Sequence, residues 1–109
     1  MLTIDERSLG LLKTPGEALL LGIITNEGRI LLREAGEHMC PGHIQWARSE
    51  PEIHPGYGFS LIARNGLVTE IFRTSALNVS QEDRLLPREL AEELMSLLPV
   101  SDDLRVYGN

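Results

Sequence analysis

The chain has 109 residues, the length of one small domain built around a single hydrophobic core, so we expect residues 1–109 to form one domain. Hydrophobic residues make up 42% and charged residues 24%, a composition that excludes an intrinsically disordered chain. Ten lysines and arginines stand against 16 aspartates and glutamates. The resulting net charge of -6 argues against nucleic acid and anionic membranes as partners, because their binding depends on clustered basic residues.

Cysteine content and hydropathy indicate where the protein resides. Cys40 is the only cysteine, so the chain cannot form an internal disulfide and a reducing compartment is expected. The longest apolar run, 18–24, is far shorter than a membrane-spanning helix. Charged side chains interrupt residues 1–17, where a secretory leader needs an apolar stretch. We therefore expect a soluble cytoplasmic protein.

A β-hairpin is the first strong element. A short edge strand over 2–4 precedes it, and the hairpin strands run over 18–24 and 29–33 with the turn between them. If Thr25 pairs with Arg29, both faces are apolar; one contains Leu19, Leu21, Ile23 and Leu31, and the other contains Leu20, Ile24, Ile30 and Leu32. An antiparallel hairpin with one face in water alternates apolar with polar residues, so this hairpin must be covered on both sides.

The central loop 36–57 contains all three histidines, the only cysteine and the only tryptophan. Long connections of this kind are often functional. A zinc site would use imidazole and thiolate ligands, for which the candidates are His38, Cys40, His43 and His54. Their spacing matches no common metal motif, and ordinary loop histidines beside an inert thiol explain the same residues, so no metal or cofactor is expected.

Cysteine catalysis is a second hypothesis for this loop. Cys40 would be the nucleophile and His38 or His43 the base, because a neighbouring imidazolium lowers the pKa of a thiol. Glu70 would be a buried acid. A small hydrolase or transferase is the function that these residues would support.

Recognition is the third hypothesis for the loop. Trp46, Arg48, His54 and Tyr57 are candidate contacts, because aromatic rings with a polar group suit partly buried binding surfaces. The alternative for Trp46 is a short core strand over 43–48, in which it shares an apolar face with Ile44.

Asn65-Gly66 predicts a second hairpin, with strands over 58–64 and 67–73, because both central turn positions need positive φ. Pairing Arg64 with Leu67 places five apolar residues and one acid on the core face: Phe59, Leu61, Ala63, Val68, Phe72 and Glu70. An acid on that face is costly unless it is paired.

Leucines at helical spacing predict one long C-terminal helix: Leu86, Leu90, Leu94, Leu97 and Leu98. Pro87 fits the first helical position, Pro99 ends the helix, and a short edge strand over 104–107 follows. The predicted fold is a two-layer α+β domain. Its antiparallel sheet consists of the two hairpins and edge strands, and the helix packs on one face.

One helix cannot cover both faces of the first hairpin. We therefore predict a homodimer through residues 18–32, with the N-terminal segment or the central loop as the alternative cover. The predicted function is a non-enzymatic, acidic binding or regulatory module that recognises a protein partner or a small ligand through the central loop. The alternative is a small hydrolase or transferase that uses Cys40 with His38 or His43, either alone or assisted by a metal ion.

Overall fold

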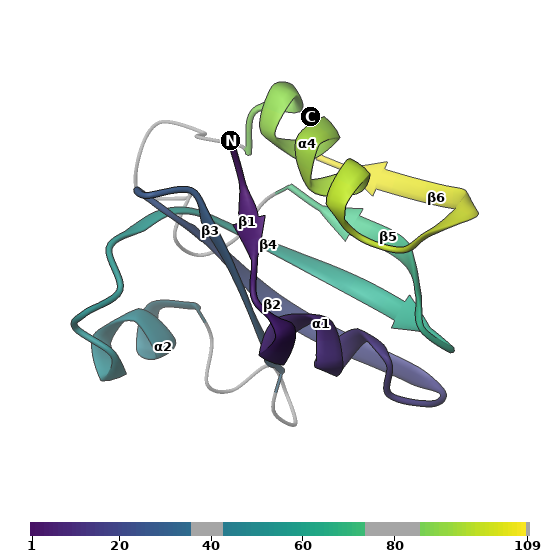
Figure 1. Cartoon of the computed structure of the whole chain (residues 1–109), viewed down its shortest axis with the longest axis horizontal. Coiled ribbons are helices and arrows are strands. Elements are labelled where there is room, and N and C mark those ends of the chain that lie inside the picture. The colour runs from purple at the N-terminus through teal and green to yellow at the C-terminus, as the bar shows by residue number, and fades with distance from the viewer. Residues whose placement is uncertain (36–42, 74–85, 109) are drawn as a thin grey trace.

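The fold is known from a computed structural model that describes residues 1–35, 43–73 and 86–108. Its six strands form one sheet in the order β1-β3-β2-β4-β5-β6 (Figure 1). The strands are β1 (Thr3–Ile4), β2 (Glu17–Thr25), β3 (Arg29–Glu34), β4 (Pro55–Arg64), β5 (Leu67–Phe72) and β6 (Val100–Tyr107). The inner pairs are antiparallel, whereas β1 runs parallel to β3 and β6 runs parallel to β5.

Helices lie on both faces of this sheet. In the described residues they are α1 (Glu6–Leu12), α2 (His43–Ser49) and α4 (Arg88–Leu97). α1 and α4 pack on the front face, as Figure 1 shows, and α2 packs on the back face. The predicted antiparallel sheet with one long C-terminal helix is therefore wrong: the sheet is mixed, and the described residues form three short helices.

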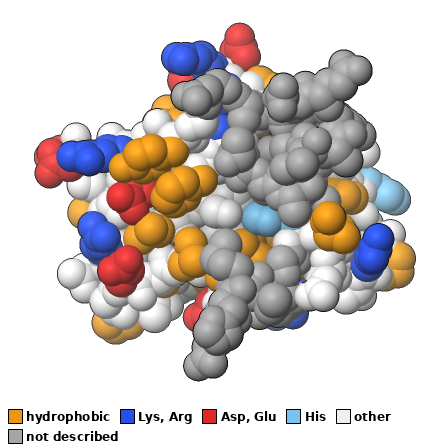
Figure 2. Space-filling view, turned by 180° about the vertical axis from the view of Figure 1, so that it is seen from behind, with side chains coloured by type: hydrophobic (Ala, Val, Ile, Leu, Met, Phe, Trp, Pro, Cys, Tyr) orange, Lys and Arg blue, Asp and Glu red, His pale blue; other side chains and the backbone are white. Residues whose placement is uncertain are grey.

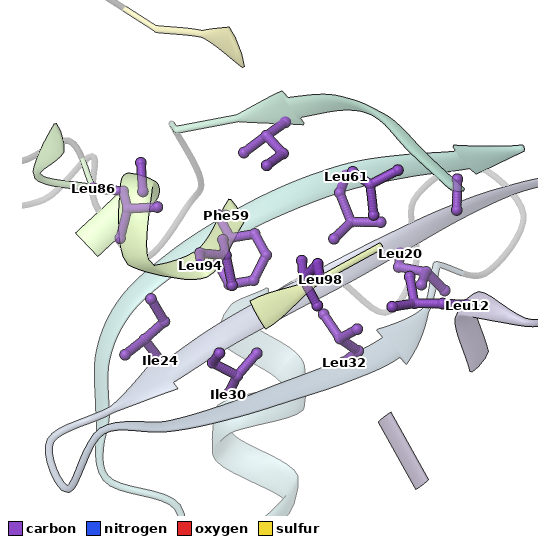
Figure 3. Close-up of a cluster of buried hydrophobic side chains, with 14 of the residues drawn as sticks. Leu12, Leu20, Ile24, Ile30, Leu32, Phe59, Leu61, Leu86, Leu94 and Leu98 are labelled. Carbon is purple, nitrogen blue, oxygen red and sulfur yellow. The ribbon is translucent and has the colours of Figure 1, made fainter. Parts of the chain in front are cut away.

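The first hairpin has the predicted register. Ile24 pairs with Ile30 and Ile23 with Leu31, so alternate residues of both strands face opposite sides. The front face belongs to the main core, whose buried side chains Figure 3 shows around Phe59 and Leu94. The back face belongs to a smaller cluster around Leu21, Ile23 and Trp46. Both faces of this hairpin are covered, as its apolar pattern requires.

α1 follows directly from the edge strand β1. Asp5 is its N-cap, and the carboxylate accepts a hydrogen bond from the Ser8 backbone N–H at 2.8 Å. Leu12 lies in the main core. The buried Ser8 hydroxyl accepts a hydrogen bond from the Leu32 backbone N–H at 3.1 Å. α1 therefore covers the front face and satisfies a donor on the outer edge of β3, which β1 pairs only at Arg29 and Ile30.

α2 covers residues 43–49, where the sequence supports two interpretations of Trp46: a binding contact, or part of a short core strand over 43–48. Ile44 and Trp46 alternate as they would in a strand, but the helix turns Trp46 inward and leaves Ile44 42% exposed. Trp46 packs in the cluster with Leu21 and Ile23. Because the chain covers its own hairpin, the structure gives no support to a homodimer through residues 18–32.

The second hairpin has the predicted turn, with Arg64 opposite Leu67 and Asn65 at a φ of 52°. A β-bulge at Thr69 then shifts the register, so Ile71 lies opposite Leu61 in the core. Phe72 and Glu70 consequently lie on the back face. The prediction that these two residues face the core is wrong, and the bulge removes the cost of placing an acid there.

Prolines at both ends limit α4 to ten residues. Pro87 is its N-cap, and Leu98 adopts an extended conformation because it precedes Pro99. The chain then continues as β6, four residues earlier than the predicted strand over 104–107. β6 joins β5 in parallel because the helix returns the chain to the same end of the sheet.

Gly22 lies where β2 passes beneath a large side chain of β4. Its register partner is Phe59, whose fully buried ring lies over the glycine backbone. A methyl group added at Gly22 would overlap that ring. The absence of a side chain at Gly22 thus makes room for the largest buried side chain of the main core.

We expect Gly22→Ala to lower the free energy of unfolding by about 1–3 kcal/mol, because the added methyl group displaces Phe59. Gly10→Ala in α1 is the matched control: open space surrounds this position, and alanine stabilises a helix interior by about 0.5–1 kcal/mol over glycine. Urea unfolding measures both changes. Equal stability of Gly22→Ala and the native chain would contradict this packing.

Candidate functional site

A groove of about 910 Å³ lies along the outer edge of β3. α1 forms one wall, and α2 with the following residues 50–53 forms the other. Leu31 and Trp46 line the groove between these walls and form its floor. The groove lies between two helices that pack on opposite faces of the sheet.

Three arginines line the groove. Arg29 and Arg33 come from β3, where the strand alternation places both on the same face as Leu31, and Arg7 comes from the exposed side of α1. In the described residues, none of the three forms an ion pair. The pKa of Asp5 lies below its usual value mainly because of the hydrogen bond from the Ser8 backbone, and the charges of Arg29 and Arg7 lower it further. The guanidinium groups of the three arginines are therefore available to a ligand.

Four carboxylates share the lining: Asp5, Glu34, Glu50 and Glu52. Two of them already accept hydrogen bonds from the chain. Asp5 caps α1, and Glu50 accepts the Trp46 indole N–H at 2.6 Å. These hydrogen bonds occupy acceptor positions on the two carboxylates and leave fewer for a ligand. The arginines are therefore the stronger binding groups of the groove.

The predicted recognition residues do not gather at one place. Trp46 is 3% exposed and contributes to the groove floor, whereas Arg48 is exposed on α2 and does not line the groove. His54 is exposed beside Glu27, with 3.4 Å between its Nδ1 and the carboxylate. Tyr57 packs against the front core. Trp46 and Tyr57 thus lie on opposite faces of the sheet.

The predicted catalytic and metal-binding residues lie apart where the structure describes them. His38 and Cys40 are outside the described residues. His43 is buried under α2, and Glu70 is partly buried at the other end of the back face, level with Arg105. Among residues 1–35, 43–73 and 86–108, no group of histidine, cysteine and acidic side chains is placed to hold a metal ion.

His43 has a structural environment. Its Nε2 donates a hydrogen bond to the Phe59 carbonyl oxygen at 2.6 Å, and no carboxylate in the described part of the chain bonds to the ring. Burial lowers the pKa of His43 below its ordinary value of 6.5, and this effect exceeds the opposing hydrogen bonds to the Phe59 and Gly22 backbone. The neutral ring anchors the first turn of α2 to the middle of the sheet.

Comparison of the chain with protein-family models, curated protein sequences and solved structures gives no match. None of the helices in the described segments has the length and hydropathy needed to cross a bilayer. The function is therefore inferred from the geometry of the chain alone.

The groove arginines were missed from the sequence, although a signal for them existed. Arg29 and Arg33 flank Leu31 at every second position of a predicted strand, which places all three on one face. Asp5 and Ser8 have the spacing of a helix cap, which indicates α1. What the sequence does not show is that the edge of β3 lies between two helices.

We expect the free energy of unfolding to fall as the pH drops below 6.5, where the unfolded chain protonates His43 and the folded chain does not. The slope from this residue reaches up to about 1.4 kcal/mol per pH unit. His43→Gln should flatten the profile between about pH 7.5 and about pH 5.5. Urea unfolding across this range measures the slope, and identical profiles for the native chain and His43→Gln would contradict the assignment.

Proposed function

We propose that the chain is a non-enzymatic binding module that recognises an extended segment of a protein partner in the groove between α1 and α2. The central observation is that three arginines without ion-pair partners in the described residues line an open groove with an apolar floor. The proposal retains the expected use of the central loop, because its residues 43–53 supply one wall.

The composition of the groove favours a protein segment over a small molecule. Pockets for small ligands are enclosed and mostly apolar. Here seven of the fourteen lining residues are charged. A polypeptide offers alternating charged and apolar side chains together with backbone hydrogen-bonding groups, which match such a lining.

The arrangement on β3 specifies what the segment should contain. Arg29 and Arg33 are four residues apart on one face, a separation of about 13 Å, with Leu31 between them. An extended peptide presents residues i, i+2 and i+4 on one face with the same spacing. A segment with carboxylates at i and i+4 and an apolar residue at i+2 therefore fits the groove.

The net charge of -6 does not exclude an acidic segment. At physiological salt, charges more than about 8 Å apart are largely screened. The contacts within the groove are closer than this, and arginine forms paired hydrogen bonds with a carboxylate. The acidic surface slows the approach of such a segment, and the groove arginines provide the affinity.

Trp46 provides a direct test because it is the only tryptophan and lines the groove. The capped peptide Glu-Ser-Val-Ser-Glu should change the Trp46 fluorescence saturably, with a dissociation constant near about 1 mM for so short a ligand. The matched peptide Lys-Ser-Val-Ser-Lys should bind at least about tenfold more weakly, because it places cations against the arginines.

The variants compare two positions in the groove with one outside it. Arg29→Gln combined with Arg33→Gln should weaken the acidic peptide by about tenfold or more, while Arg48→Gln, on the same wall helix, should leave the affinity unchanged. A flat titration, or equal effects of Arg48→Gln and the double variant, would refute the proposal.

A further inference from the structure

Strand register places a second surface on the back of the sheet, beyond α2. Ile62 lies level with Glu70 and Arg105, and Ser60 lies level with Phe72 and Tyr107. We call this surface the β5–β6 patch and define it by four apolar residues and two charged ones: Ile62, Leu67, Phe72, Tyr107, Glu70 and Arg105. The patch is formed by the half of the sheet that lies away from the groove.

Apolar side chains of this patch remain accessible. Leu67 is 45% and Tyr107 40% exposed, and the rings of Phe72 and Tyr107 stack with centroids 5.1 Å apart. Figure 2, which views this side of the molecule, shows hydrophobic side chains gathered there among acidic and basic ones. Stacked aromatic rings with a polar edge are enriched at protein interfaces.

The two charges of the patch lie side by side without pairing. Glu70 and Arg105 are register partners on neighbouring strands, yet they form no ion pair within the described part of the chain. A two-fold axis through the patch would bring Glu70 of each copy opposite Arg105 of the other copy. A surface with one acid beside one base and an apolar centre is thus complementary to itself.

We propose that the β5–β6 patch is the interface of a homodimer. Glu70 of one protomer pairs with the partner's Arg105, the reverse pair forms across the two-fold axis, and Tyr107 packs against its copy between them. This interface goes beyond the proposed peptide binding and leaves the groove at the β3 edge open in both protomers. The interface is small and includes charges, so the dimer is weak and forms at micromolar concentration.

Sedimentation equilibrium over a concentration series tests this interface with charge reversal. Glu70→Arg alone and Arg105→Glu alone should each raise the dissociation constant about tenfold or more, since each places like charges together twice. The double variant Glu70→Arg, Arg105→Glu should recover the native constant within about threefold, because both pairs form again with exchanged signs. Arg48→Glu, on α2, is the matched control and should have no such effect.

Recovery in the double variant supports the interface. A native chain that stays monomeric up to about 1 mM overturns it, as does a dimer that is insensitive to the single variants or not restored by the double variant. Thermal unfolding of every variant confirms that the fold is retained. If one single variant fails to fold, Tyr107→Ser replaces it and should also weaken the dimer.

Discussion

Leu21 and Ile23 point away from the main core, and the burial of these two side chains holds α2 against the back of the sheet. α2 has seven residues, too few for a stable helix in isolation. Each large apolar side chain in such a cluster contributes about 1.5–3 kcal/mol when it is fully buried. The helix therefore exists because β2 presents an apolar back face.

The candidate site depends on this docking. Trp46 is fixed with the buried pair and supplies part of the groove floor, while its indole N–H holds Glu50 on the rim. On the other side of the sheet edge, α1 is fixed through Leu12 in the core and Ser8 on Leu32. With both walls anchored, the arginines of β3 lie in a preformed groove, which reduces the cost of ordering a bound segment.

The local parts of the fold were predictable from the sequence. The register of the first hairpin and the turn of the second follow from turn residues and alternating apolar runs, and the need to cover both faces of the first hairpin follows from its register. The bulge at Thr69 has no such signal, because it inserts a residue into an otherwise regular pattern. α2 was not predicted because Ile44 and Trp46, two residues apart, have the spacing of one face of a strand. β1 pairs with β3 and β6 pairs with β5, and in both cases the partner strand is distant in the sequence. Contacts between distant segments also form the groove between α1 and α2, so the groove was not foreseen.

The nuclear Overhauser effect between the indole protons of Trp46 and labelled methyl groups tests the docking of α2 most directly. The chain has one tryptophan, so every cross-peak from indole protons is assigned to Trp46. We expect cross-peaks to Leu21, Ile23 or the adjoining Leu31, and none to Leu20 and Ile24, which face the opposite side. An indole without methyl contacts, or with contacts to Leu20 and Ile24, would contradict the account.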